Sequence, residues 1–324
     1  MMERYARQIV LPEVGRAGQE KLHDAAVLIV GAGGLGCAVL QYVGAAGVNR
    51  LIVVDHDRVE ESNLHRQPLY RMSDVGNLKV DAARAALLST NPTLEITAVP
   101  ERLTPANAAR LIESANIVVD AADSFAATYT LSDACRRAGK CLISASVLGL
   151  SGYAGVFCGG APSYRAVFPD LPHQAGSCVE LGVLGTAVGV LGTLQAQLVL
   201  SVLLEIEPSV RGRVVTVDLR TLRFGGFDFM DAAEPDASGV QFIALSDLDA
   251  EDCIVDLRSV TEAPVPVLPS ALRTDPQDLA QFNYGLARDR RVVLCCRSGV
   301  RAWRAARTLQ RGGHENLALI ALGP

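Results

Sequence analysis

Short apolar runs alternate with longer segments of helical periodicity along the first 150 residues. The apolar runs are typical of buried strands, and the longer segments predict helices between them. The expected strands are 27–30, 51–54, 94–99, 117–120 and 141–145, and the expected helices are 34–46, 79–89, 105–114 and 128–138. This alternation predicts an α/β fold, a doubly wound and mostly parallel sheet with helices on both faces.

Two further strands are expected at 152–157 and 214–224, and an uncharged apolar stretch, 183–204, lies between them. That stretch is long enough to cross a membrane. It contains three glycines together with Gln195 and Gln197, in a chain that otherwise has the pattern of a soluble protein. We therefore expect a buried core helix and no membrane association.

The pattern changes between Gly225 and Gly239, where glycines, acidic residues, a proline and a serine follow one another without periodicity. We expect a first domain over 1–228, a linker over 229–239 and a second domain over 240–324. In the second domain, 253–257 and 292–295 predict buried strands and 302–311 predicts a helix. These elements indicate a second, smaller α/β unit.

Composition supports a globular protein: 49% of the 324 residues are hydrophobic and 20% are charged. The net charge of −5 argues against a nucleic-acid partner. The segment 1–7 lacks the apolar core of a signal peptide. The eight cysteines are scattered, a pattern that suits reduced thiols. We expect a cytoplasmic location.

A glycine-rich turn joins the first expected strand to the first expected helix. A turn of this kind presents backbone N–H groups and a helix N-terminus to an anion. Asp55 follows the next strand, where an acid that binds ribose is expected. Taken alone, these features fit an NAD-dependent dehydrogenase as well as an ATP-using enzyme. The glycines of the turn are Gly31, Gly33, Gly34 and Gly36.

Two cations favour ATP, because a triphosphate requires positive charge beyond that of the loop amides. They are Arg66 and Lys79. Asp123, just past the strand that ends at Asp120, is placed to hold Mg²⁺ between phosphate oxygens. The alternative is that Arg66 and Lys79 are solvated surface charges.

Over residues 4–225 the chain resembles the MoeB/ThiF family, bacterial relatives of the ubiquitin-activating enzymes. The matching segments are 4–9, 31–36, 55–57, 63–67, Lys79, 91–92 and 120–123. The resemblance implies a Rossmann-like fold and an enzyme that uses Mg-ATP to adenylate the C-terminal Gly-Gly carboxylate of a ubiquitin-like sulfur carrier.

The same resemblance assigns roles to individual residues. Gly34 and Asp55 would hold the adenosine, Asn63, Arg66 and Lys79 the phosphates, and Asp123 the metal. Asp57 and Ser124 are further candidates for nucleotide binding. Arg7 would reach the ATP site of the other subunit of a homodimer.

The chain also departs from the family. Ser124 stands where the family usually has Asn, and Thr128 stands where it has Arg, so an ionic contact is missing. Many members bind structural zinc through two CxxC pairs, but here Ser163 and Ala166 occupy the first pair and 228–238 contains no cysteine. We expect no zinc. Cys178 is either a thiol that links to or resolves the carrier, or a structural residue.

A second anion-binding loop follows the strand 292–295 and precedes the last helix. Successive N–H groups and the helix dipole would stabilise a thiolate or persulfide on its first residue. The loop has the form CxxGxR, and with Asp256-Leu257-Arg258 it resembles the rhodanese fold over 240–324. A phosphatase loop is the alternative, although it has one more residue between Cys and Arg. The loop residues are Cys296, Arg297, Ser298, Gly299, Val300 and Arg301.

Together the two loops predict an adenylyltransferase with a short sulfurtransferase domain. The carrier would be adenylated first and then converted to a thiocarboxylate by a persulfide on Cys296, loaded by a donor such as a cysteine desulfurase. An NAD-dependent oxidoreductase and a catalytically weak carrier-binding scaffold are the alternatives.

Overall fold

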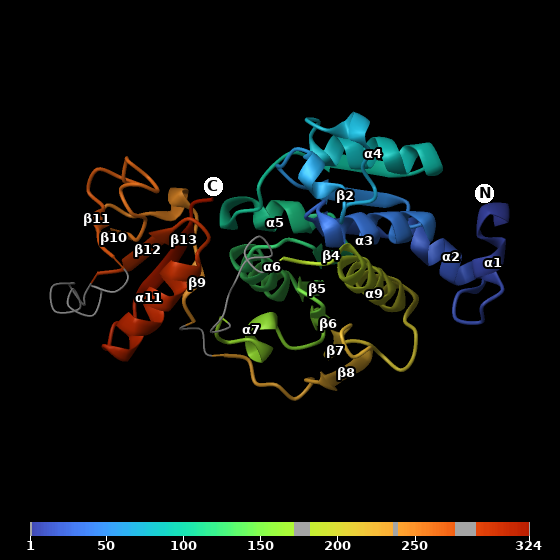
Figure 1. Cartoon of the computed structure of the whole chain (residues 1–324). Coiled ribbons are helices and arrows are strands. Elements are labelled where there is room, and N and C mark those ends of the chain that lie inside the picture. Colours follow the sequence, from blue (N-terminus) through green and yellow to red (C-terminus); the bar gives the residue numbers. More distant parts are fainter. Residues whose placement is uncertain (1, 172–181, 236–238, 276–289, 324) are drawn as a thin grey trace.

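The computed structural model describes residues 2–171, 182–235, 239–275 and 290–323, and in this part the chain forms two sheets (Figure 1). The first sheet has eight strands in the order β3-β2-β1-β4-β5-β6-β7-β8. Its parallel half, from β3 to β5, is the predicted doubly wound sheet. The strands are β1 (Ala26–Val30), β2 (Arg50–Val54), β3 (Glu95–Val99), β4 (Ile117–Asp120), β5 (Cys141–Leu148), β6 (Ser151–Cys158), β7 (Arg213–Asp218) and β8 (Arg223–Asp228).

Helices cover both faces of this sheet, as expected. On one face, α3 (Gly34–Ala45), α4 (Lys79–Thr90) and α9 (Gly185–Leu204) contribute to one buried apolar cluster. On the other face, α5 (Pro105–Glu113) and α6 (Phe125–Ala138) contribute to a second. Both faces of β1 are therefore buried, and all five of its residues are apolar and inaccessible to solvent.

Among the described helices, α9 is the one that is long and apolar enough to cross a membrane. It packs against α3 and against β5 and β6. Gln195 in its centre is fully buried and donates hydrogen bonds to the carbonyls of Asp120 and Ile143. The expected core helix agrees with this packing.

Several boundaries differ from those expected. The apolar segment 214–224 is two strands, β7 and β8, joined by a turn at residues 219–222. The irregular composition from Gly225 onward belongs in part to β8, because glycine allows Gly226 its φ of 157° where a Cβ would overlap the Val214 carbonyl. Elements that the periodicity did not predict include the turn η1 (Met2–Tyr5), the helices α1 (Ala6–Ile9), α2 (Gly15–Asp24) and α7 (Tyr164–Val167), and the turns η2 (Glu61–Asn63) and η3 (Met72–Asp74).

The second sheet has five parallel strands in the order β11-β10-β12-β13-β9. Two of its strands, β10 and β12, match the predicted ones, and α11 begins two residues before the expected start, whereas β9 and β11 were not predicted. The turn η4 (Leu245–Asp247) follows β9, which is the first strand of this unit along the chain. The elements are β9 (Gln241–Phe242), β10 (Cys253–Asp256), β11 (Leu272–Arg273), β12 (Val292–Cys296), α11 (Val300–Arg311) and β13 (Leu317–Ala321).

The two units share an apolar contact between α6 and α11. The rings of Tyr129 and Trp303 lie 4.7 Å apart, and both side chains belong to one buried cluster. The guanidinium of Arg165 lies 4.7 Å from the centre of the Tyr129 ring and 5.5 Å from that of Trp303. At the edge of this contact, Arg307 pairs with Asp170 at 2.6 Å. The second unit is therefore packed on the first.

Candidate functional site

The glycine turn lies between β1 and α3, at the carboxyl end of the parallel strands. Gly31 has a φ of 99°, and its N–H donates to the carbonyl of Val54. A Cβ at Gly36 would overlap the Gly31 carbonyl, and a Cβ at Gly34 would lie 2.5 Å from Val188 of α9. Gly33, the N-cap of α3, has no side chain that could accept the first N–H groups of the helix, so these groups can bind an anion.

Asp55 joins this turn to the end of β2. One carboxylate oxygen accepts the N–H of Ala32 at 2.7 Å, and the other accepts the N–H of Asp57 at 2.8 Å. The carboxylate is thus fixed beside the turn, where the sequence predicted a group that binds ribose.

Lys79 is a buried cation and not a solvated surface charge. Its side chain is 8% exposed, and Nζ lies 2.8 Å from a carboxylate oxygen of Asp57. Burial opposes ionisation of Asp57, but the hydrogen bond and charge of Lys79 outweigh it and lower the pKa of that carboxyl. Tyr70 fixes the Lys79 backbone to the turn, because its hydroxyl contacts the carbonyls of Ala32 and Lys79.

The segment after β2 brings Asn63 and Arg66 to the same edge of the sheet. Asn63 is buried, and its side-chain carbonyl accepts the N–H of Glu60. Arg66 donates to the carbonyl of Ser62, and one of its nitrogens lies 2.9 Å from the ring of His65. Gln67 is 3% exposed, with a side-chain oxygen that finds no partner in the described part of the chain. The matching motif included Gln67, but the sequence gave it no role.

Arg102 and Asp123 are further charged residues whose charges act on one another near Asp57. Asp123 is exposed beyond the end of β4, and Arg102 follows β3. Burial lowers the pKa of the Arg102 guanidinium, while the charges of Asp57 and Asp123 oppose that shift. The sequence analysis missed Arg102, although its position just past a parallel strand was the available signal.

Carboxylates suited to Mg²⁺ lie at this edge. Asp55, His56 and Asp57 place ligand atoms within 4.8 Å of one another. Asp123, the predicted metal ligand, is exposed and shares Arg102 as a neighbour with Asp57. Oxygen donors of this kind fit Mg²⁺ held together with phosphate oxygens.

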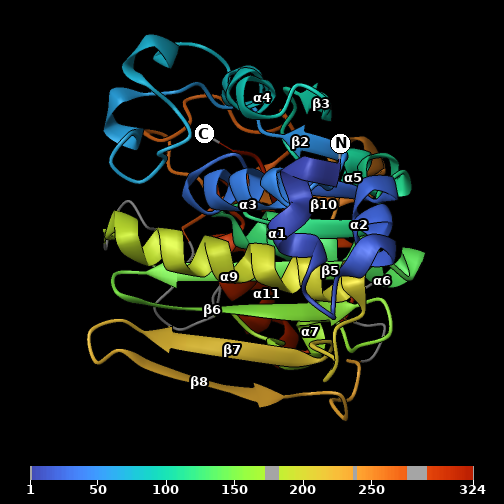
Figure 2. The same ribbon diagram turned by 90° about the vertical axis from the view of Figure 1, so that its right-hand side faces the viewer.

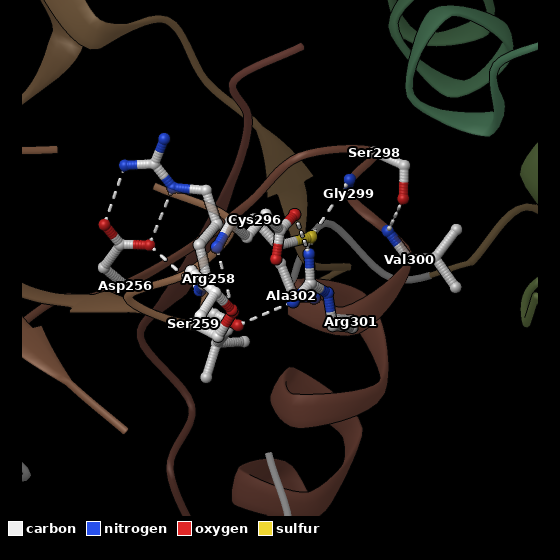
Figure 3. A network of polar contacts seen from close by, with 12 residues as sticks. Asp256, Arg258, Ser259, Cys296, Ser298, Gly299, Val300, Arg301 and Ala302 are labelled. Carbon is white, nitrogen blue, oxygen red and sulfur yellow. Dashed lines mark hydrogen bonds and ion pairs between the residues drawn. The ribbon is translucent and has the colours of Figure 1, made fainter. Parts of the chain in front are cut away.

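In the second unit, the loop from Cys296 to Arg301 turns its N–H groups toward sulfur (Figure 3). Sγ of Cys296 accepts the N–H of Gly299 at 3.1 Å and that of Ala302 at 3.4 Å. Gly299 has a φ of 85°, and a Cβ there would lie 2.6 Å from the ring of Phe242. The loop therefore has the sulfur-cradling geometry that the sequence predicted.

Two arginines, one from α11 and one after β10, make contacts at the end of β10 beside this loop. Arg301 donates to the carbonyl of Leu257 and pairs with Glu262. Arg258 makes a two-pronged contact with Asp256 (Figure 3). Burial of Asp256 opposes ionisation, but the hydrogen bonds from Arg258 and from the N–H of Val267 hold its pKa at about 2.

The neighbouring cysteine lies on the other side of β12 from Cys296. Cys295 belongs to a small apolar cluster with Ile254 and Ile320, and burial raises its pKa to about 12. Cys178 lies outside the described residues. Four further cysteines are buried and free, namely Cys37, Cys135, Cys141 and Cys158.

A protein-family model described as the ThiF family matches residues 5–239, which contain all of the nucleotide-site residues above. The chain belongs to the ThiF family. The adenylyltransferase and sulfurtransferase MOCS3 of Bos taurus is 47% identical over 220 residues, which are 67% of this chain and 48% of that protein. The sulfur carrier protein adenylyltransferase of Thermus thermophilus is 43% identical over 225 residues, 67% of this chain and 83% of that protein.

The chain spans about half the length of the MOCS3 relatives that it matches. Among solved structures, E. coli MccB with MccA-N7isoASN has a TM-score of 0.64 at 22% identity, over 74% of this chain and 75% of that one. PaaA has a TM-score of 0.61 at 23% identity, over 70% and 73%. These likenesses show the fold.

One departure from the usual ThiF-family sequence has a structural explanation. Thr128 is buried, and its hydroxyl faces the carboxyl of Asp120 at the end of β4. Asp120 is fully buried, which raises its pKa to about 6, and Ser144 also donates to it. Thr128 therefore supports the interior. Ser124 caps α6 and accepts from Thr128 through its backbone carbonyl.

A polar link occupies the place where many family members have the first zinc-binding CxxC pair. The N–H and hydroxyl of Ser163 each donate to the carboxylate of Glu234 at 2.7 Å. Arg136 of α6 lies 3.4 Å from the same carboxylate. Glu234 belongs to the segment where the second cysteine pair was expected, so this contact joins the two segments that zinc would join in other members.

Proposed function

We propose that this chain uses Mg-ATP to adenylate the C-terminal Gly-Gly carboxylate of a ubiquitin-like sulfur carrier in the cytoplasm. The observation that carries the proposal is the buried Lys79 beside the glycine turn and Asp57. A triphosphate requires such a cation next to the loop amides. The names of the relatives support the carrier as the substrate class.

The residues suit adenylation without a general base. A carboxylate is already ionised at neutral pH, so the site must align it with the α-phosphate and stabilise charge on the departing pyrophosphate. In this proposal the N–H groups of α3, Arg66 and Lys79 hold the phosphates, and Asp55 holds the ribose. Asp123 would hold Mg²⁺, which supplies charge to the phosphate oxygens when bound.

We further propose that Cys296 supplies sulfur, as a rhodanese-like persulfide. A donor such as a cysteine desulfurase, or thiosulfate, transfers one sulfur atom to the Cys296 thiolate; with thiosulfate, sulfite leaves. The outer sulfur attacks the acyl adenylate, forming an acyl disulfide and releasing AMP. A thiol then attacks the Cys296 sulfur, which releases the thiocarboxylate and leaves a disulfide on Cys296; a second thiol, from an external reductant, reduces that disulfide and restores Cys296. Cys178 is the candidate within the chain for this resolving thiol.

A homodimer is the third part of the proposal. Gln8 donates to the carbonyl of Ala46 at the far end of α3, about 18 Å along the helix from the glycine turn. Arg7, next to Gln8, is therefore remote from the turn of its own chain. The helix α9 runs from the turn, where Val188 contacts Gly34, toward α1 (Figure 2).

The outer side of α9 offers a surface for that pairing. A shallow apolar hollow lies along it, and Phe224 at its edge is 64% exposed. A two-fold contact across this helix would bring the partner's Arg7 to the glycine turn. The hollow is lined by Thr186, Gly189, Val190, Thr193, Leu194, Gln197 and Phe224.

Carrier-dependent exchange of pyrophosphate into ATP tests the proposal. With a bacterial ubiquitin-like carrier ending in Gly-Gly, we expect exchange, and no exchange with the same carrier lacking its last glycine. Asp123→Ala and Arg66→Ala should each lower the rate about 10²–10³-fold. Near-normal exchange in both variants, or micromolar binding of NAD without binding of ATP, would contradict the ATP site.

A further inference from the structure

The last described residues of the second unit pack against Arg102 of the first. A Cβ at Gly323 would overlap the guanidinium of Arg102, so this side chain lies directly on the glycine. The C-terminal end of the chain correspondingly lies between the second sheet and α5 (Figure 1). Gly323 has a φ of 85°, which favours glycine at this contact.

Gly323 is connected to the Cys296 loop, and Arg102 lies near the nucleotide site. The N–H of Gly323 donates to the carbonyl of Arg297, and the N–H of Leu322 donates to the carbonyl of Cys296. On the other side, Arg102 is held by Asn107, whose amide donates to the Arg102 carbonyl at 2.9 Å. The guanidinium shares its surroundings with Asp57 and Asp123. One contact therefore separates the sulfur loop from the carboxylates of the nucleotide site.

Arg102 forms no ion pair within 4 Å in the described part of the chain, although two carboxylates influence it. Other arginines of this region pair directly, as Arg110 does with Glu101 at 2.6 Å. The guanidinium of Arg102 instead lies against the backbone of Gly323. The position of Arg102 therefore suits a residue that fixes the chain end after β13, and not one that forms an ion pair on the surface.

We propose that Arg102 is a positioning residue that seats the C-terminal strand end, through Gly323, so that the Cys296 loop faces the adenylate made in the same chain. This rests on the proposed function. In this proposal neither Arg102 nor Gly323 contacts the persulfide or the acyl adenylate. It sets the distance between the persulfide and the acyl adenylate, and effective concentration falls steeply when such a geometry is lost.

The test separates three steps in full-length protein. Adenylation is measured by pyrophosphate exchange. Loading of Cys296 is measured by mass spectrometry after incubation with thiosulfate. Transfer is measured as single-turnover formation of the carrier thiocarboxylate in the presence of dithiothreitol. The variant is Gly323→Ala, whose methyl group displaces Arg102. Gly313→Ala is the matched control, because Gly313 has a φ of 88° in the same unit.

We expect Gly323→Ala to lower thiocarboxylate formation at least tenfold, while exchange and loading stay within twofold of wild type and Gly313→Ala changes none of them. Arg102→Ala should lose transfer equally, the double variant should be no worse than either single one, and Arg102→Lys should recover part of the rate. Wild-type transfer in Gly323→Ala, or loss that follows loss of loading, would overturn the positioning role. Absence of exchange in the wild type would instead contradict the proposed function.

Discussion

The ammonium group of Lys79 lies 2.8 Å from a carboxylate oxygen of Asp57, and only 8% of the Lys79 side chain is exposed. Burying a lysine is costly unless a partner compensates its charge. Here the partner is half-exposed, so an incoming phosphate can share the cation without leaving a buried carboxylate behind. The pair therefore keeps a cation charged and oriented at the glycine turn before ATP arrives.

Replacing this lysine tests the cation. Lys79→Met keeps most of the side-chain volume but removes the charge, so carrier-dependent pyrophosphate exchange should fall about 10²–10³-fold. Lys21→Met is the matched control, because Lys21 pairs with Glu205 at 2.5 Å on the surface. The control should retain wild-type exchange. Equal rates in the two variants would remove Lys79 from the phosphate site.

The adjacent cysteines should behave differently. Cys296→Ala is expected to leave pyrophosphate exchange intact and abolish persulfide formation, because Sγ of Cys296 accepts the N–H groups of Gly299 and Ala302. Cys295→Ala should retain loading, since Cys295 faces the apolar cluster on the other side of β12. Mass spectrometry of peptides after incubation with thiosulfate distinguishes them. Added sulfur on Cys178 alone would show that the second unit is not the sulfur donor.

Assembly through α9 can be tested by charge. Leu194→Glu places a carboxylate in the apolar hollow beside Phe224, and we expect monomers in analytical ultracentrifugation together with loss of exchange. Val260→Glu, at a position 62% exposed in the second unit, is the control and should leave the dimer unchanged. Mixing Arg7→Ala with Asp123→Ala should recover part of the activity. An active wild-type monomer would contradict the dimer.

Zinc content tests the polar link between Ser163 and Glu234. We expect no stoichiometric zinc by elemental analysis, because no thiolate occupies the two expected positions of the first pair. Glu234→Ala should lower the melting temperature, since it leaves the hydroxyl and N–H of Ser163 without their acceptor. Glu207→Ala, on the surface, serves as the control. One zinc per chain would contradict this account.

Acid should destabilise the second unit through Asp256. Its pKa is lowered to about 2, so its contribution to stability is present above the unfolded value of about 3.9 and is lost as the pH falls toward 2. Arg258→Ala should move acid unfolding to higher pH, as followed by fluorescence of Trp303, the single tryptophan. Arg290→Ala is the control: it removes a surface ion pair with Glu251 and should leave the pH of acid unfolding unchanged. An unchanged transition in Arg258→Ala would exclude this linkage.

Local patterns were sufficient for much of the fold. The strands β1, β2 and β4 lie within a residue of their expected bounds because continuous apolar runs of this length are buried on both faces. The sequence analysis did not predict the edge strand β8 as a separate strand, because both of its faces are exposed and its residues show no alternation of apolar and polar positions. The short helix α1 gave no signal either, since a single turn has no measurable period.

The sequence by itself determined the two anion-binding loops, because their glycines and the order strand, turn, helix are local features. Only the tertiary structure decided which groups meet: Lys79 with Asp57, Ser163 with Glu234, and Arg102 with Gly323. These partners are far apart in the chain, and no periodicity relates them. The bridge between Arg58 and Leu78 places Lys79 beside Asp57, and packing of α11 on α6 joins the two units that meet at Arg102 and Gly323. These contacts therefore follow from the three-dimensional arrangement of whole elements and not from any single segment.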